Sequence, residues 1–272
     1  MSINDPAQNH TFALCAYKES PYLEDCVQSL LAQTVKSKIF LATSTDNAHI
    51  RAVAEKYSLP LFVNPQNPGI ATDWQFALEC AHTQYVTIAH QDDVYYPEYT
   101  ASILPMMERS VIGFSNYEEL TEHGVRAKTG MLRVKRMLLW PFYFKHTIKN
   151  KFVKKSILRF GSPICCPSVM YNRKLAQGEL FDASYHNKLD WDAWLRFAEQ
   201  EDAFAYSKRI LMAHRIHAES ETSKQIASAG RAQEDKAMFQ RLWPGFLADL
   251  IMKFYARSYT YNQNDAREEK AE

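Results

Sequence analysis

The chain has 272 residues, of which 46% are hydrophobic, 23% charged and 13% aromatic, and its formal net charge is +1. This composition excludes a disordered chain, a collagen and a small disulfide-rich protein. The length suits one large domain or two small ones. The balanced charge predicts no nucleic-acid partner, because general attraction to phosphate needs a large excess of basic residues.

The first third of the chain alternates short apolar runs with amphipathic stretches. Strands are expected at 11–17, 38–43, 61–64 and 85–89, and helices at 21–33, at 48–57 and around 74–81. Strands that alternate with helices predict an α/β fold built on a largely parallel sheet. Further along, strands are expected at 165–171 and 204–214, a helix at 191–198, and a helical pair at 233–259 that is broken at Pro244. The tail of residues 262–272 is charged, and we expect it to fray.

The cysteines and the N-terminal residues indicate the cellular compartment of the protein. Cys15, Cys26, Cys80, Cys165 and Cys166 form an odd set without CxxC spacing, which favours free thiols in a reducing compartment. We expect Cys165 and Cys166 to be buried strand residues and not nucleophiles. No secretory signal is visible in residues 1–10, and the longest apolar run, 137–144, is too short to span a bilayer. These features predict a cytoplasmic protein.

Polar residues follow the strand that ends near Ala89. His90, Gln91, Asp92 and Asp93 stand where open α/β sheets bind ligands, just beyond the carboxyl end of a strand. Adjacent carboxylates suit Mg2+ or Mn2+, which take oxygen ligands and share them with substrate phosphates. An alternative role for one of these aspartates is to cap a helix that begins near Pro97.

Three further positions are candidates for chemistry. Asp190 precedes a helical face, so it is either an N-cap or a general base for an attacking hydroxyl. Arg215 and His217 lie two residues apart after a strand and point to one side, where they suit an anion or a metal. Asp46 follows the second strand and either caps the next helix or contacts a nucleotide.

The middle of the chain has an unusual charge pattern. Residues 123–178 contain no Asp or Glu but many Lys and Arg, with the aromatic residues Trp140, Phe142, Tyr143 and Phe144 among them. One interpretation is an ordinary solvated basic face. The other is a surface for anionic lipid head groups or for an acceptor that carries a diphosphate.

Taken together, these motifs resemble glycosyltransferase family 2. The resemblance covers about residues 11–222: Ala16-Tyr17-Lys18-Glu19-Ser20 resembles the nucleotide loop, Ser44-Thr45-Asp46 the second-strand motif, and Asp73-Trp74 the helix before the metal motif. Ala89 to Asp93 occupies the place of the DxD segment. Leu189 to Arg196 resembles the segment with the catalytic base, and His214 to His217 lies where relatives place a histidine near the metal. Two positions depart from the pattern: His90 replaces the first Asp of DxD, and Leu41-Ala42 replaces an acidic pair.

The resemblance implies an inverting enzyme of the GT-A fold that moves a sugar from a nucleotide-diphosphate sugar, with UDP-sugars favoured, to a saccharide or lipid-linked acceptor in polysaccharide synthesis. It implies Asp190 as the base, and Asp92 and His217 as ligands of Mn2+ or Mg2+. The implied donor-binding residues are Ala16, Tyr17, Glu19, Asp46, Asp73, His90, Asp92, Asp93 and Arg215. The basic segment adds an expected peripheral contact with an anionic membrane, at its inner face.

The expected organisation is a GT-A domain at 1–222, with a donor half at 1–93, an acceptor half at 94–222 and a helical extension at 223–272. Two other functions remain open at this point. A nucleotidyltransferase that makes sugar nucleotides would need a glycine-rich phosphate loop, and residues 16–20 contain no glycine. The second open function is a non-catalytic module that binds a sugar or anionic lipid, and the replacement of the first DxD acid by His90 is its main support.

Overall fold

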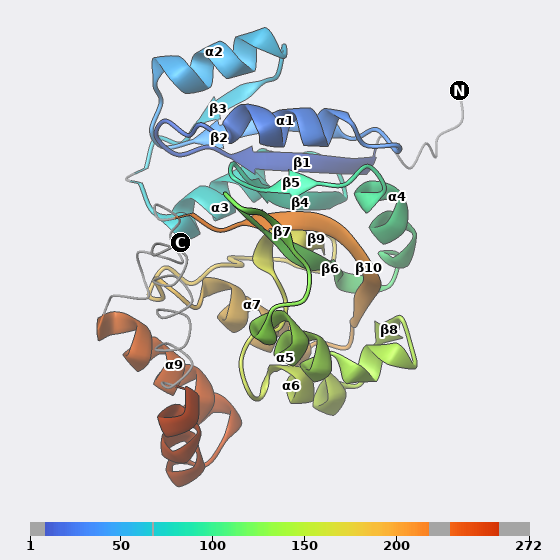
Figure 1. The fold of residues 1–272 in the computed structure, drawn as a ribbon, viewed down its shortest axis with the longest axis vertical. Helices are drawn as coiled ribbons and strands as arrows, with labels where there is room; N and C mark the ends of the chain where they lie inside the picture. The colour runs from blue at the N-terminus through green and yellow to red at the C-terminus, as the bar shows by residue number, and fades with distance from the viewer. Residues whose placement is uncertain (1–8, 67, 218–228, 256–272) are drawn as a thin grey trace.

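The computed structural model describes residues 9–66, 68–217 and 229–255. Within them, one mixed sheet carries helices on both faces (Figure 1). The strands are β1 (His10–Cys15), β2 (Lys38–Thr43), β3 (Leu61–Val63), β4 (Tyr85–His90), β5 (Val94–Tyr95), β6 (Ser110–Thr121), β7 (Gly124–Arg126), β8 (Thr147–Ile148), β9 (Val169–Asn172) and β10 (Ala203–Arg215).

The helices are α1 (Leu23–Leu31), α2 (Ala48–Lys56), α3 (Ile70–Cys80), α4 (Tyr99–Ile103), α5 (Gly130–Leu138), α6 (Lys151–Leu158), α7 (Leu189–Ala198) and α9 (Ala229–Leu242). Short 3-10 turns form η2 (Leu104–Met106), η3 (Trp140–Tyr143) and η4 (Cys166–Ser168). Residues 245–255 are also helical, so the chain breaks its helix at 243–244, as Pro244 predicts.

The strand order explains where a ligand can meet the sheet. The order is β3-β2-β1-β4-β9-β6-β10-β5, with β7 on β6 and β8 on β10. Strands β1 to β4 are mutually parallel, β9 is antiparallel to both β4 and β6, and β10 is parallel to β6. The carboxyl ends of β1, β2, β4, β6 and β10 therefore meet at one edge of the sheet, which confirms the predicted α/β architecture.

Side chains on the two faces of the sheet pack into two separate hydrophobic cores. Phe12 and Leu14 of β1 pack with the buried faces of α1 and α2, whereas Ala13 belongs to the core beneath α3 and α7. Met238 and Phe239 of α9 are fully buried in this second core. The helix α9 is thus packed onto the sheet domain by apolar contacts and does not stand apart from it.

Most elements of the first half lie where periodicity places them, whereas the sequence predicted no element at β6, β7, α5, β8 or α6. The first six residues of the 12-residue strand β6 are all buried, so they show no alternation. The expected strand at 165–171 begins as η4 and becomes β9 only at Val169. The boundary between 222 and 223, the tail 262–272 and Asn67 lie outside the described residues.

Several cations of the acid-free segment serve the fold. Lys154 is fully buried, and its ammonium donates to the carbonyl oxygens of Phe197, Gln200 and Asp202 at 3.3, 2.7 and 2.7 Å. These bonds satisfy carbonyl groups at the end of α7. Burial lowers the pKa of Lys154 to about 8. The interpretation as a simply solvated basic face is therefore wrong for this residue.

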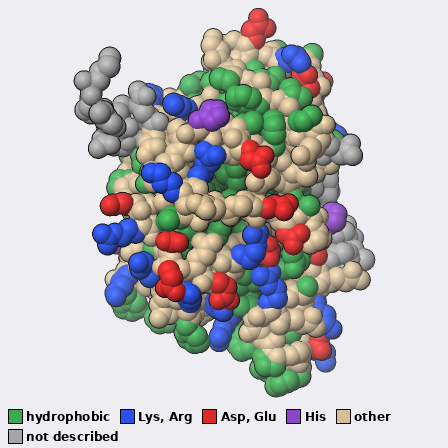
Figure 2. All heavy atoms as spheres, turned by 180° about the vertical axis from the view of Figure 1, so that it is seen from behind, with side chains coloured by type: hydrophobic (Ala, Val, Ile, Leu, Met, Phe, Trp, Pro, Cys, Tyr) green, Lys and Arg blue, Asp and Glu red, His purple; other side chains and the backbone are tan. Residues whose placement is uncertain are grey.

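All five cysteines are free thiols, and burial raises the pKa of both Cys165 and Cys166. Raised thiol pKa values oppose a nucleophilic role, because the thiolate is the reactive form. No helix among the described residues is long and apolar enough to cross a membrane. Figure 2 shows the face opposite to that of Figure 1, where acidic and basic side chains are intermixed.

Candidate active site

The ends of β4 and β10 are joined by a buried carboxylate. Asp93 is fully buried, and its Oδ1 lies 2.9 Å from His214 Nδ1 and accepts a hydrogen bond from the Arg215 backbone N–H at 2.9 Å. This contact holds the last residues of β10 against the turn that follows β4. The adjacent residues Asp92 and Asp93 therefore have different contacts, and the Asp93 side chain points inward.

Asp92 faces the other way, toward the rim of the site. Its Oδ2 lies 3.0 Å from Nε2 of His217, and both side chains keep about a fifth of their surface exposed. Arg215 Nε donates to the Asp92 carbonyl oxygen at 2.8 Å. Neither aspartate caps α4, whose N-cap residue is Glu98. The structure thus brings together Asp92, Arg215 and His217, as the sequence predicted.

Two residues of the first loop and helix complete this corner. The Arg215 guanidinium lies over the Tyr22 ring at 4.2 Å and 3.3 Å from an Asp25 carboxylate oxygen. The Tyr22 ring is also 5.0 Å from the His217 ring. These contacts fix the Arg215 guanidinium in one direction at the sheet edge.

The protonation states in this corner follow from burial and from the neighbouring charges. Burial opposes ionisation of Asp92, but the hydrogen bond with His217 and the nearby imidazoles of His90 and His214 lower its pKa overall. Burial also opposes a charged His214, yet Asp93 raises the pKa of that imidazole. Asp92 is therefore a carboxylate at neutral pH, the form that binds a cation.

The donor set at this corner fits a hard divalent cation that is shared with a substrate. Among the described residues, no group of three or more His, Cys, Asp and Glu side chains is arranged to hold a metal ion. Asp92 and His217 offer one carboxylate and one imidazole side by side. Mg2+ and similar ions are often held by one or two carboxylates together with substrate phosphates, so two protein ligands suffice.

His90 lies where the family's DxD segment starts with an acid. Its ring stacks on Trp74 at a centroid distance of 5.0 Å, and Trp74 also contacts Phe181 at 5.1 Å. Burial lowers the pKa of His90, although Asp93 and Asp92 oppose this shift. His90 is consequently a neutral imidazole, and its buried Nε2 has no hydrogen-bond partner among the described atoms.

The loop after β1 is tied to its neighbours through backbone groups. The Gln91 side chain accepts from the Tyr17 N–H at 2.9 Å and donates to the Tyr17 carbonyl at 3.0 Å. Lys18 has a left-handed φ of 54°, and its N–H donates to Thr45 Oγ1 at 2.6 Å. A strained, anchored backbone of this kind is common at ligand sites. Ala16 is buried beneath this loop, whereas the side chains of Tyr17 and Glu19 are exposed.

Two other predicted donor residues have contacts of their own. Asp73 of α3 accepts from Ser44 Oγ at 2.7 Å and from Asn64 Nδ2 at 2.9 Å, so it ties together the ends of β2 and β3. Asp46 does not cap α2, because Asn47 is the N-cap and accepts from Ile50 N at 2.9 Å. Asp46 instead pairs with the exposed Arg51.

Asp190 lies in the first turn of α7 but is not its N-cap, which is Lys188. Its Oδ1 accepts a hydrogen bond from the Trp191 N–H at 2.7 Å. Burial raises the pKa of Asp190, while Lys188, Trp191 N–H and Lys135 act against this rise. A raised pKa suits a carboxylate that must accept a proton.

The C-terminal helix α9 holds the segment that carries Asp190. Glu234 accepts from the backbone N–H groups of His186 and Asn187 at 2.9 and 2.7 Å. Lys188 forms a buried ion pair with Asp235 at 2.7 Å, and Arg241 lies 2.5 Å from Asp192. Three residues before Asp190 and one after it are thereby fixed to α9, which no sequence pattern indicated.

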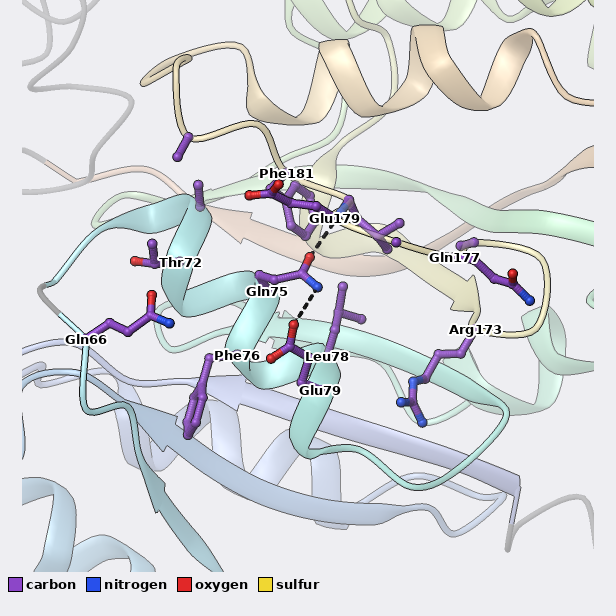
Figure 3. A pocket seen from close by; sticks show the side chains of 15 residues that line it. Gln66, Thr72, Gln75, Phe76, Leu78, Glu79, Arg173, Gln177, Glu179 and Phe181 are labelled. Carbon is purple, nitrogen blue, oxygen red and sulfur yellow. Dashed lines mark hydrogen bonds between the residues drawn. The ribbon is translucent and has the colours of Figure 1, made fainter.

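A cavity of about 570 Å³ lies beside this site, between α3 and the loop before α7 (Figure 3). Gln75 reaches across it, accepting from the Leu180 N–H at 3.0 Å and donating to Glu79 at 2.8 Å. Phe181, which contacts Trp74, lies in the wall of this cavity. None of the predicted site residues lines it.

With this geometry in view, the comparisons with known proteins decide the family. The family model described as glycosyl transferase family 2 matches residues 11–178, which is more than half of the chain. The chain belongs to glycosyl transferase family 2. It is therefore a glycosyltransferase, and both the predicted family and the predicted class of enzyme are confirmed. No curated protein matches the chain.

Solved structures of this GT-A fold agree with the architecture. The mannosyltransferase PcManGT from Pyrobaculum calidifontis, solved with GDP-Man and Mn2+, has a TM-score of 0.63 at 13% identity, covering 91% of this chain and 69% of its own. Residues 1–349 of S. aureus TarS give 0.58 at 13% identity, covering 94% and 73%. The same TarS fragment with UDP-GlcNAc gives 0.55 at 14% identity, covering 93% and 73%. The predicted GT-A fold is thus confirmed.

Some residues of this family 2 site were not singled out from the sequence. Asp25 contacts Arg215, and Trp74 stacks on His90. Lys188 joins the Asp190 segment to α9 through its ion pair with Asp235. Trp74 stands within a quoted motif, so an aromatic residue next to a motif position was the signal that could have found it. Asp25 and Lys188 carry no such signal.

Proposed function

We propose that this family 2 enzyme is an inverting transferase that moves a sugar from a nucleotide-diphosphate sugar, with a UDP-sugar as the favoured donor, to a hydroxyl of a saccharide or lipid-linked acceptor. The observation that carries the proposal is the corner formed by Asp92, His217 and Arg215 at the carboxyl ends of β4 and β10. It combines two ligands for a cation with a fixed guanidinium. That combination suits a diphosphate.

Asp190 is the base in this proposal. Its carboxylate accepts the proton of the acceptor hydroxyl as that oxygen bonds to the anomeric carbon, and the bond from this carbon to the diphosphate oxygen breaks. A single displacement inverts the configuration. Base catalysis of this kind contributes about 10² to 10⁴ in rate. The raised pKa of Asp190 supports the role, because burial makes its carboxylate a better proton acceptor.

The diphosphate side of the reaction is assigned to the opposite corner. Arg215 holds the phosphate, while Asp93 positions Arg215 through its backbone N–H. Asp92 and His217 would hold Mn2+ or Mg2+, and such an ion, when bound, neutralises the charge on the departing diphosphate. The relative PcManGT is described with Mn2+ and GDP-Man, which supports this assignment.

The nucleoside end is assigned to the loop after β1 and its neighbours. The anchored backbone at Ala16 and Tyr17, with Glu19, Asp46 and Asp73 around it, faces the same sheet edge as Asp92. His90 has a buried, unpartnered Nε2 that can bond a hydroxyl of the donor. We place the enzyme in polysaccharide synthesis in the cytoplasm, at the inner face of the membrane, where lipid-linked acceptors are found.

The experiment that tests this function is thermal unfolding with UDP, GDP, CDP or dTDP, each with and without Mn2+. A ligand at 100 times its dissociation constant adds about 2.7 kcal/mol of stability. We expect a Mn2+-dependent rise in Tm with UDP that Asp92→Ala removes. No rise with any nucleotide would contradict the donor site and favour a module that binds sugar or lipid without catalysis.

The catalytic step has its own test. Asp190→Asn should abolish transfer while it costs about 1 kcal/mol or less in stability, since the amide oxygen can still accept from Trp191 N–H. Retained turnover would refute the base assignment. The anomeric configuration of the product, read by NMR, distinguishes inversion from retention. The nucleotidyltransferase alternative would instead form a sugar nucleotide from a nucleoside triphosphate, which this chain should not do.

A further inference from the structure

The helix α5 distributes its side chains in an unusual way. Its cations Lys135 and Arg136 are turned inward, whereas Val134, Met137 and the following Trp140 and Phe144 are exposed, Met137 at 64% and Phe144 at 79%. A surface helix normally buries its apolar residues and exposes its charged ones. We call Val134, Met137, Trp140 and Phe144 the α5 surface.

Lys135 and Arg136 point inward because each donates hydrogen bonds to groups of the protein. Lys135 donates to Tyr117 OH at 2.7 Å. Arg136 donates to Asn116 Oδ1 at 3.0 Å, to the Ala127 carbonyl at 2.6 Å and to the Tyr117 carbonyl at 3.1 Å. These bonds and the burial of Leu132 fix the rotation of α5, which leaves Val134 and Met137 exposed.

The exposed side chains follow one another closely along α5 and η3. Val134 and Met137 are three residues apart on α5, which places them on neighbouring turns of one face. Trp140 follows in η3, and its ring lies 6.0 Å from that of Phe144. Contiguous exposed apolar side chains of this size are typical of an interaction surface.

The charges around the α5 surface identify the partner. Arg133 and Lys145 are exposed beside it, and neither forms an ion pair with any residue that the structure describes. The surrounding segment 123–178 contains no acidic residue. Exposed aromatic and aliphatic side chains with two exposed cations beside them match an anionic phospholipid bilayer, which offers an apolar interior beneath negative head groups.

We propose that the α5 surface docks this enzyme on an anionic phospholipid bilayer, with Met137, Trp140 and Phe144 inserted among the lipids and Arg133 and Lys145 on the head groups. The other side of the same helix is held on the sheet, since Lys135 donates to Tyr117 OH of β6. The lipid contact itself does not depend on the proposed donor or acceptor.

The test is sedimentation of the full chain with vesicles of phosphatidylcholine alone or with phosphatidylglycerol. We expect binding to the anionic vesicles that weakens as salt rises, because the head-group contacts are screened. Trp140→Ser and Phe144→Ser should each reduce binding at least about fivefold, and Arg133→Gln with Lys145→Gln should reduce it about fivefold per cation.

Matched controls separate this surface from general apolarity and charge. Phe246→Ser removes a ring that is 74% exposed on the helix of residues 245–255, and Lys38→Gln removes an exposed cation at the start of β2. Both controls should bind as wild type does. Equal loss in a control and in Trp140→Ser, or no binding to anionic vesicles, would overturn the proposal.

A protein partner is the competing outcome. If light scattering shows a dimer that Trp140→Ser dissociates while vesicle binding is unchanged, the surface is an interface between copies of the chain and the lipid proposal fails. Because binding is measured without donor or acceptor, Asp190→Asn should still bind vesicles. Loss of transfer and loss of docking are thus distinguishable.

Discussion

The ammonium of Lys188 lies 2.7 Å from the Asp235 carboxylate, and both side chains are buried. This ion pair joins the first turn of α7, which carries Asp190, to α9. A helix far along the chain thereby sets the position of the proposed base. Its contribution can be measured separately from that of the base itself.

Breaking this pair should impair both stability and turnover. Asp235→Asn removes the carboxylate that contacts the buried Lys188 ammonium, and breaking a buried ion pair costs about 3–5 kcal/mol. We expect a lower free energy of unfolding and a lower kcat with little change in the KM for the donor. Urea unfolding and steady-state kinetics measure the two effects.

The control for this variant lies on the same helix. Lys236→Ala removes an exposed ion pair with Asp249, which is 2.8 Å long and worth about 1 kcal/mol or less. Lys188→Met combined with Asp235→Leu should recover stability, because neither charge of this pair then remains buried. Wild-type kcat in Asp235→Asn would show that α9 supports the fold and does not position the base.

The two adjacent aspartates should respond differently to the same change. Asp92→Asn should remove the Mn2+-dependent stabilisation by nucleotide, about 2.7 kcal/mol at 100 times the dissociation constant, and alter the free protein little. Asp93→Asn should instead destabilise the free protein by about 1–3 kcal/mol, since its buried carboxylate interacts with His214 and Arg215 N–H. Thermal unfolding of both variants, with and without ligand, measures this contrast; identical behaviour would contradict the division of roles.

The pH dependence of transfer should report on Asp190. The base acts when ionised, so the rate falls as pH drops through its pKa. Burial raises that pKa, and the Lys135 charge lowers it. Lys135→Met should therefore move the acidic limb of kcat/KM to higher pH, whereas Lys135→Arg should leave it in place. If Lys135→Met does not move the acidic limb of the kcat/KM profile, a group other than Asp190 sets that limb.

A buried histidine should make stability sensitive to acid. His10 lies 2.8 Å from Ser37 Oγ and 3.0 Å from Thr87 Oγ1, and burial lowers its pKa to about 3. Below pH 6.5 the unfolded chain binds a proton that the native state does not, so stability present above 6.5 is lost as pH falls toward 3. The loss is on the order of 1 kcal/mol per pH unit.

The variant His10→Gln isolates this effect. Glutamine keeps polar contacts near β1 but does not titrate, so its free energy of unfolding should fall less than that of wild type between pH 7 and 5. Denaturant unfolding at both pH values measures the difference. Parallel losses in the two proteins would assign the acid sensitivity to other groups.

Several features could be predicted from the sequence because they are local. The strands and helices of the first half follow from hydrophobic period, and β2 lies at the predicted residues. Asp92, Arg215 and His217 could be grouped because the carboxyl ends of parallel strands meet at one edge. The family follows from the order of motifs between about residues 11 and 222, and the family model matches residues 11–178 of that range.

Other features depend on contacts between distant residues. The inward course of Asp93, the stacking of His90 on Trp74 and the packing of α9 against the Asp190 segment join residues that no short pattern connects. The separate extension predicted for 223–272 stays a prediction, although α9 packs into the sheet core.

The sequence by itself thus determined the α/β class, the sheet edge at which the candidate site residues gather and the family, because period and motif order are written along the chain. Only the tertiary structure decided which of two adjacent aspartates lies at the rim of the candidate site, what holds Asp190, and that α5 turns Lys135 and Arg136 inward. Those outcomes depend on which polar groups become buried together, since a buried charge must find its partner wherever the fold supplies one.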